Sequence, residues 1–227
     1  EPGPAVAIFA GVHGNERAGV YALQQLLPAL SITKGTLYVA FANPPAIEAN
    51  VRMVNKNLNR CFYKDNKGTD PEDIRARELM AVLDKCDALL DLHMFYDEKD
   101  KPFVICEHNA LDLAQKLDVD IISTNWTAVE PGGTDGYMYE NGKIGVCVEC
   151  GPLAKSEEYT DFAIQTIYQF LKHFDMSNKE VTFSTKPKRL VKAMKAIYKT
   201  SDDFVLTPGL RDFQKLEEGQ LLATDKT

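Results

Sequence analysis

An apolar segment at residues 6–10 runs directly into a glycine-flanked turn, and a segment with helical spacing of apolar residues follows. A strand, a tight turn and a helix in this order begin a sheet that carries helices on its faces. His13 and Glu16 lie in the turn, three positions apart. Because such folds form their sites at the carboxyl ends of strands, this segment constrains both the fold and the position of its chemistry.

The same alternation continues along the chain and predicts an α/β fold. Strands are expected at residues 6–10, 36–42, 88–92, 103–106, 121–122 and 144–148, and helices after residue 16, from about residue 71 and over residues 155–174. Residues 50–70 are polar and contain glycine, so a long loop is expected there. We predict a doubly wound sheet that is mixed rather than purely parallel.

The pattern changes at about residue 178. Beyond it, short apolar segments at 193–198, 204–206 and 221–223 are separated by Pro208, Gly209 and Gly219, without helical periodicity. We therefore expect a catalytic domain at residues 1–178 and a small β-rich unit at residues 179–227. About 45 residues are few for an independent barrel, so this unit is expected to be truncated or to pack on the first domain.

Composition excludes several classes of partner. Of 227 residues, 44% are hydrophobic and 26% charged, as in ordinary globular proteins, and no apolar run is long enough to span a membrane. A net charge of −7 without a basic cluster argues against nucleic acid and requires local arginines to recruit a small anionic substrate. Five cysteines, an odd number and mostly in apolar segments, favour reduced thiols in a cytoplasmic protein. The sequence leaves open whether the chain forms a homo-oligomer.

His93, at the end of the strand expected at 88–92, completes a candidate metal site with His13 and Glu16. Two imidazoles and one carboxylate are a typical ligand set for catalytic zinc, because they leave a fourth position for water. Each residue alone has another explanation, such as a capped helix or a satisfied core histidine. Asp91 lies on the same strand face as His93 and could orient its imidazole, or be a buried acid satisfied by loop amides.

Glu149 and a group of loop residues are candidates for catalysis and substrate binding. A carboxylate that ends an apolar strand is costly unless partnered, and beside a metal Glu149 would serve as a general base. The alternative is a structural acid paired with a lysine or arginine. Arg52, Asn59 and Arg60 lie in the long loop, where guanidinium groups can bind carboxylates or stabilise an oxyanion, or remain solvated charges.

Together these segments resemble the succinylglutamate desuccinylase and aspartoacylase family, a branch of the zinc carboxypeptidase superfamily. The resemblance covers most of the first 175 residues and rests on four motifs in order, at residues 11–16, 43–60, 91–93 and 148–152. It implies that His13, Glu16 and His93 hold one zinc ion. It also implies a β-rich C-terminal domain, which the segment from about residue 181 would begin.

The resemblance further implies roles in amide hydrolysis for four residues. Glu149 would activate the attacking water and Arg52 would polarise the scissile carbonyl. Asn59 and Arg60 would hold a substrate carboxylate. The expected reaction converts an N-acyl amino acid into a carboxylic acid and a free amine.

The chain departs from the family pattern at two places, one in the loop and one that concerns the substrate. Asn57 stands where the family often has aspartate. The aspartoacylase branch also has an arginine shortly before the catalytic glutamate that holds a second substrate carboxylate. This chain has no arginine between Arg77 and Arg189, and Tyr137 and Tyr139 in that stretch could bind a less charged group.

The sequence thus favours a zinc-dependent amidohydrolase that acts on a small anionic N-acyl amino acid. A carboxypeptidase-like enzyme acting on short or cell-wall peptides is an alternative, since a single carboxylate clamp serves both. A non-catalytic sensor of acyl amino acids is a third hypothesis, which the presence of Glu149 disfavours because a binder needs no base beside its metal.

Overall fold

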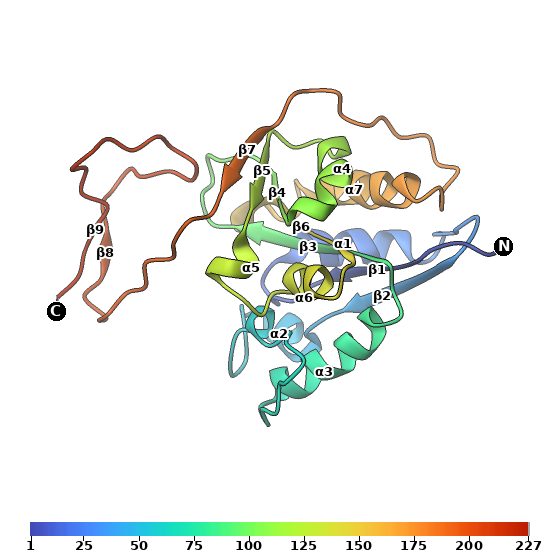
Figure 1. Ribbon diagram of the computed structural model, residues 1–227, viewed down its shortest axis with the longest axis horizontal. Coiled ribbons are helices and arrows are strands. Elements are labelled where there is room, and N and C mark those ends of the chain that lie inside the picture. The colour runs from blue at the N-terminus through green and yellow to red at the C-terminus, as the bar shows by residue number, and fades with distance from the viewer. Residues whose placement is uncertain (227) are drawn as a thin grey trace.

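The computed structural model describes residues 1–226, and its core is one twisted sheet (Figure 1). Its strands are β1 (Ala5–Ala10), β2 (Thr36–Phe41), β3 (Ala88–Phe95), β4 (Phe103–Cys106), β5 (Ile121–Thr124), β6 (Ile144–Pro152) and β7 (Arg189–Lys192). Their order across the sheet is β2-β1-β3-β6-β4-β5-β7. Strand β4 runs antiparallel to β6, whereas the other neighbouring pairs are parallel. The prediction of a mixed α/β sheet is therefore confirmed.

Helices cover both faces of this sheet. They are α1 (Arg17–Leu26), α2 (Pro44–Ala49), α3 (Pro71–Leu83), α4 (Leu111–Lys116), α5 (Trp126–Val129), α6 (Thr134–Glu140) and α7 (Thr160–His173). Short 3₁₀ turns lie at Leu58–Arg60, His108–Ala110 and Leu153–Lys155. Buried side chains of α1, α4 and α7 pack on one face and those of α3 and α6 on the other. Alternate β1 residues supply both cores, Ile8 to the first and Phe9 to the second.

The sequence locates most of these elements, with differences at their ends. Strand β4 has its predicted bounds, and β3 extends past the predicted end to Phe95. Helix α7 begins at Thr160 rather than near residue 155, because a 3₁₀ turn precedes it. Helices α2, α4, α5 and α6 were not predicted, and all four are short, so their periodicity is weak.

The C-terminal segment differs more from expectation. A strand was expected at residues 193–198. The observed strand, β7, lies earlier, at Arg189–Lys192, and pairs in parallel with β5 of the main sheet. Met194 and Ile197 are more than two-thirds exposed, at 76% and 72%. Strands β8 (Val205–Leu206) and β9 (Ala223–Thr224) pair only with each other among residues 1–226. Figure 1 shows this hairpin extending from the body on the side opposite the N-terminus. The domain boundary at residue 178 stays a prediction.

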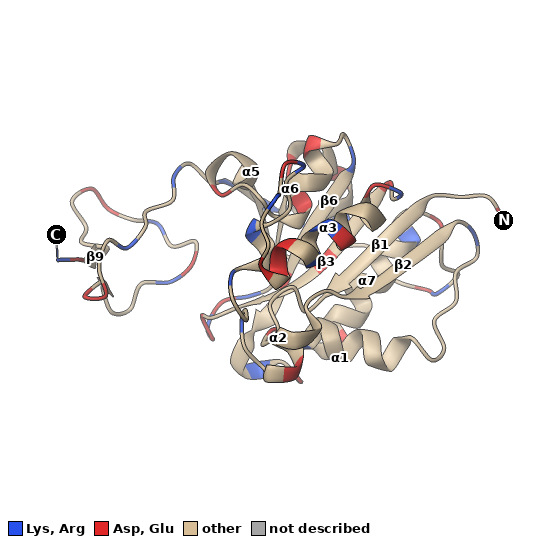
Figure 2. Cartoon of the chain, turned by 90° about the horizontal axis from the view of Figure 1, so that it is seen from below, with Lys and Arg blue, Asp and Glu red and all other residues tan. Residues whose placement is uncertain are grey.

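Three general features concern the cysteines, the helix lengths and the charged residues. All five cysteines are buried and free, including Cys147 and Cys150 of β6. Within residues 1–226, no helix has both the length and the apolar character that a membrane crossing requires. In the view of Figure 2, acidic and basic residues lie interspersed over the helices and loops.

Candidate functional site

The turn after β1 is shaped by two glycines. Gly11 has φ +71°, and a side chain there would lie 2.4 Å from Cδ1 of Ile47 in α2. At Gly14 a Cβ atom would lie 2.0 Å from the carbonyl carbon of Ala46, so only glycine permits this close approach. The turn therefore folds tightly against α2, which follows β2.

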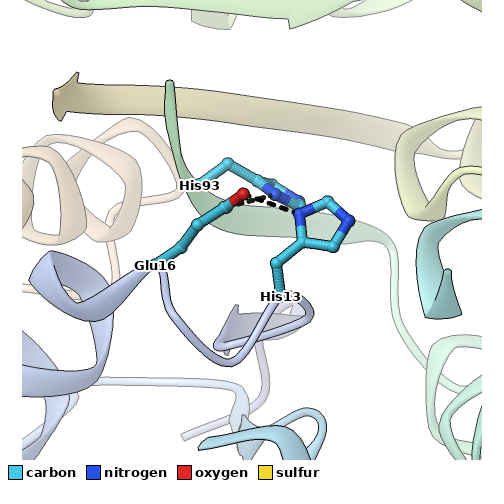
Figure 3. Close-up of side chains that lie close together, drawn as sticks. All are labelled: His13, Glu16 and His93. Carbon is cyan, nitrogen blue, oxygen red and sulfur yellow. Dashed lines mark hydrogen bonds and ion pairs between the residues drawn. The ribbon is translucent and has the colours of Figure 1, made fainter. Parts of the chain in front are cut away.

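His13, Glu16 and His93 converge in this turn (Figure 3). Nδ1 of His13 lies 2.7 Å from Oε1 of Glu16, and Nδ1 of His93 lies 2.9 Å from Oε2 of the same carboxylate. One potential ligand atom from each residue lies within 4.8 Å of the other two. All three side chains are buried, with 4%, 2% and 2% exposure. The structure thus brings together residues that are up to 80 positions apart in the chain.

The outer nitrogens of both imidazoles face hydrogen-bond acceptors. Nε2 of His93 lies 2.9 Å from Oδ2 of Asp91, and Nε2 of His13 lies 2.9 Å from Oδ1 of Asn57. The Asn57 oxygen also accepts a hydrogen bond from the Asn59 backbone amide, which fixes it as an acceptor. Both imidazoles therefore carry a proton on Nε2, and in their neutral forms their Nδ1 lone pairs point toward Glu16.

This donor set could hold a metal ion. Two nitrogen lone pairs and a buried carboxylate repel one another unless a proton or a metal ion lies between them. Burial opposes ionisation of Glu16, yet its pKa is lowered well below its usual range because His13 and His93 outweigh that effect. Burial likewise opposes the charge of His93, but Asp91 and Glu16 raise its pKa. Nitrogen, nitrogen and carboxylate oxygen are ligands that suit zinc.

Glu149 lies beside these residues on β6. In the parallel pairing of β3 and β6, His93 is opposite Glu149 and Asp91 is opposite Cys147. Because side chains alternate along a strand, these four side chains project from the same sheet face. Oε2 of Glu149 is buried and has no hydrogen-bond partner among residues 1–226. Burial, reinforced by the negative charge of Glu16, raises the pKa of Glu149 to about 8.

The three predicted loop residues also reach this site. Nη1 of Arg52 donates a hydrogen bond of 3.0 Å to Oε1 of Glu16. Oδ1 of Asn59 accepts a hydrogen bond of 3.0 Å from the Thr134 backbone amide. The Arg60 guanidinium donates to the Asn59 carbonyl and forms an ion pair with Glu130. Arg60 therefore has a carboxylate partner within the chain.

A cavity of about 770 Å³ contains the whole site. Its lining includes every predicted site residue, namely His13, Glu16, Arg52, Asn59, Arg60, His93 and Glu149. The C-terminal segment closes one side with Leu206 and residues 209–213. The ring of Phe213 packs edge-on against Phe103, with 4.8 Å between centroids. The volume lies within the range of small-molecule sites, roughly 300–1,000 Å³.

The structure corrects one expectation about the cavity wall. Tyr137 and Tyr139 do not line it: the Tyr137 hydroxyl donates to Asp84, and Tyr139 packs against His108. Asp135 lines the cavity from the same stretch, with 7% exposure. Sequence reasoning missed it because an acid among glycines at a helix start is equally typical of a cap.

Asn57 and the C-terminal wall of the cavity were also not predicted to be parts of the site. Asn57 was noted only as a departure from the family pattern, yet it holds the outer nitrogen of His13. Arg211 lies in the cavity wall and pairs with Asp100, with 3.1 Å between Nη2 and Oδ1. No local pattern in residues 205–213 signals contact with a loop more than a hundred positions earlier.

Comparison with known proteins identifies similar sequences. The model of the succinylglutamate desuccinylase/aspartoacylase catalytic domain matches residues 2–174. A "Probable aspartoacylase" of Nostoc sp. is 26% identical, with 76% of this chain and 66% of that protein covered. Another from Trichodesmium erythraeum is 25% identical, with 95% and 82% covered. The chain thus spans just under two thirds of the Nostoc protein.

Solved structures share the fold. The succinylglutamate desuccinylase of Vibrio cholerae superposes with a TM-score of 0.80 at 16% identity, covering 98% of this chain and 72% of that one. The product-bound ectoine utilization protein EutE of Ruegeria pomeroyi gives 0.70 at 22% identity, covering 91% and 66%.

Proposed function

The chain belongs to the succinylglutamate desuccinylase/aspartoacylase family, and from this premise we propose that it is a zinc-dependent hydrolase of N-acyl amino acids. The relatives named aspartoacylase and desuccinylase support cleavage of a linear amide bond. One observation carries the proposal: two imidazoles and a carboxylate converge beside Glu149, a carboxylate with an unpartnered oxygen among the described residues.

In this proposal His13, Glu16 and His93 hold the metal through two nitrogens and a carboxylate oxygen. When bound there, zinc would act as a Lewis acid and lower the pKa of a water molecule to about 7. Asp91 and Asn57 keep the two imidazoles oriented by accepting hydrogen bonds from their outer nitrogens.

Glu149 is the proposed general base. Its carboxylate takes a proton from the attacking water and passes it to the departing nitrogen as the carbon–nitrogen bond breaks. One water molecule is consumed, and a carboxylic acid and an amine are formed. Arg52 donates to the carbonyl oxygen as negative charge develops on it, which requires its guanidinium to turn from Glu16 toward the substrate.

Asn59 and Arg60 hold the substrate carboxylate in this proposal. Both residues line the cavity that contains the candidate metal ligands. The Arg60 guanidinium already pairs with Glu130, so it must either leave Glu130 or bind Glu130 and the substrate carboxylate together.

The test measures hydrolysis by protein that has been stripped with a chelator and reconstituted with zinc. The substrate panel consists of N-acetyl amino acids with acidic, neutral and basic side chains, together with dipeptides as the competing class. We expect zinc-dependent release of free amine from at least one N-acetyl amino acid. Hydrolysis of dipeptides alone would favour the carboxypeptidase-like alternative, and no hydrolysis by zinc-loaded protein would contradict the proposal.

A further inference from the structure

The arginines that line the cavity are each paired with an acid of the chain. Arg52 pairs with Glu16, and Arg60 pairs with Glu130. Arg211 pairs with Asp100, and its Nε lies 3.8 Å from Asp97. If a metal ion held Glu16, Arg52 alone would be released. Among the described residues the cavity therefore offers no spare guanidinium for a second substrate carboxylate, and its one lysine, Lys99, is exposed.

Asp135 is a buried carboxylate in the same wall. One of its oxygens, Oδ2, is buried without a hydrogen-bond partner among residues 1–226. Its backbone packs directly on β6, since a Cβ on Gly145 would lie 2.8 Å from the Asp135 Cα. The backbone of Asp135 is therefore held against β6, while its side chain faces the cavity. The Gly136 amide and the Cys147 thiol act on this carboxylate, but Oδ2 has no partner, and a donor on a ligand in the cavity can supply one.

Aromatic rings form much of the remaining wall. Phe103, Phe213 and Trp126 line the cavity, and the first two pack edge to face. The faces of aromatic rings attract cations within about 6 Å, most strongly where water is excluded. An unpartnered carboxylate together with aromatic faces is a suitable environment for an alkylammonium group, whereas it repels a second carboxylate.

We propose that the substrate is an N-acyl amino acid that also carries a positively charged amine, and that Asp135 binds this amine. This inference rests on the proposed function and names its substrate class. A monoacylated diamino acid satisfies both requirements: its carboxylate is held at Asn59 and Arg60, and its free ammonium lies against Asp135. N-acyl aspartate and glutamate would instead place a second carboxylate against Asp135.

The experiment compares kcat/KM of the zinc-loaded protein for matched substrates. The cationic set is the Nα- and side-chain-acetylated isomers of ornithine and lysine, and the neutral set is N-acetylnorvaline and N-acetylnorleucine. The dicarboxylic set is N-acetylaspartate and N-acetylglutamate. We expect the preferred cationic isomer to exceed the neutral set by about 10-fold or more, as a charge-assisted hydrogen bond provides.

The variant Asp135→Asn, which keeps the shape and removes the charge, should reduce this cationic-to-neutral ratio by about 10-fold. The exposed Asp65→Asn serves as the control and should leave the ratio unchanged. Product binding to the unmodified protein provides a second measurement that does not depend on a variant folding. Calorimetry should show tighter binding of ornithine or lysine than of norvaline or aspartate.

Four results would overturn the inference. A preference for the dicarboxylic or neutral set, or an unchanged ratio in Asp135→Asn, would refute it while the proposed function stands. Equal binding of cationic and neutral products would refute it in the same way. Zinc-loaded protein that hydrolyses none of these substrates would overturn both the inference and the proposed function.

Discussion

His93 and Glu149 occupy directly opposite positions on the neighbouring parallel strands β3 and β6. Both side chains project from the same face of the sheet into one cavity. A candidate metal ligand and a candidate base are thus held at a fixed separation by two buried strands rather than by loops. Their relative position depends on strand register, which packing on both faces fixes strongly.

The variant Glu149→Gln keeps the shape of the side chain and removes its ability to accept a proton. We predict that kcat falls by about 10²–10⁴, the usual contribution of a general base. Zinc content and thermal stability should stay at the level of the unmodified protein, because Glu149 is not one of the proposed ligands. A variant that retains more than a third of the original kcat would exclude Glu149 as the base.

Loss of Arg52 should affect the transition state. We predict that Arg52→Ala lowers kcat/KM by about 10²–10³, as removal of an oxyanion donor does. Arg17 provides a matched control, because its guanidinium donates to the Ile47 carbonyl and does not line the cavity. Equal losses in Arg52→Ala and Arg17→Ala would indicate a structural rather than a catalytic effect. Steady-state kinetics on the preferred substrate make the comparison.

Asn57 should control zinc affinity through His13. Removing the acceptor in Asn57→Ala leaves Nε2 of His13 without its 2.9 Å partner, so we predict roughly 10–100-fold weaker zinc binding. Asn57→Asp restores an acceptor and should bind zinc at least as tightly as the unmodified protein. Competition with a chromophoric chelator measures both constants. If the alanine variant matched the original affinity, the contact would have no role in metal binding.

The C-terminal wall of the cavity should contribute to substrate binding more than to chemistry. Phe213→Ala removes the ring that packs on Phe103, and we predict a rise in KM of about 10-fold with little change in kcat. Leu216→Ala, a partly exposed residue of the same segment outside the cavity, is the control. A fall in kcat without a change in KM would show that the wall has a different role.

Much of the site could be predicted from the sequence because its residues lie at strand ends. The apolar segments before His13, His93 and Glu149 predict buried strands, and parallel strands bring their carboxyl ends to one edge of a sheet. The order of β3 and β6 as neighbours could not be read from periodicity, since it depends on long-range packing. The family resemblance implied only that His93 and Glu149 belong to one site.

Other contacts carry no local signal. Asp135 follows three glycine and threonine positions that are as typical of a helix cap as of a binding site. Arg211 lies in an irregular segment, and its pairing with Asp100 depends on how the C-terminal segment crosses the cavity. Strand β7 was predicted too late in the chain because residues 193–198 are more apolar than residues 189–192. Those apolar residues remain largely exposed, so tertiary pairing rather than hydrophobicity determines which segment forms the strand.

The central claim is that His13, Glu16 and the distant His93 bind one zinc ion, and metal analysis of histidine variants tests it most directly. The chain has four histidines, of which His108 is exposed and outside the cavity. We predict about one zinc ion per chain in the unmodified protein and in His108→Ala, and a loss of most zinc in His93→Ala. Equal zinc content in His93→Ala and His108→Ala, or no zinc bound to the unmodified protein after reconstitution, would contradict the account.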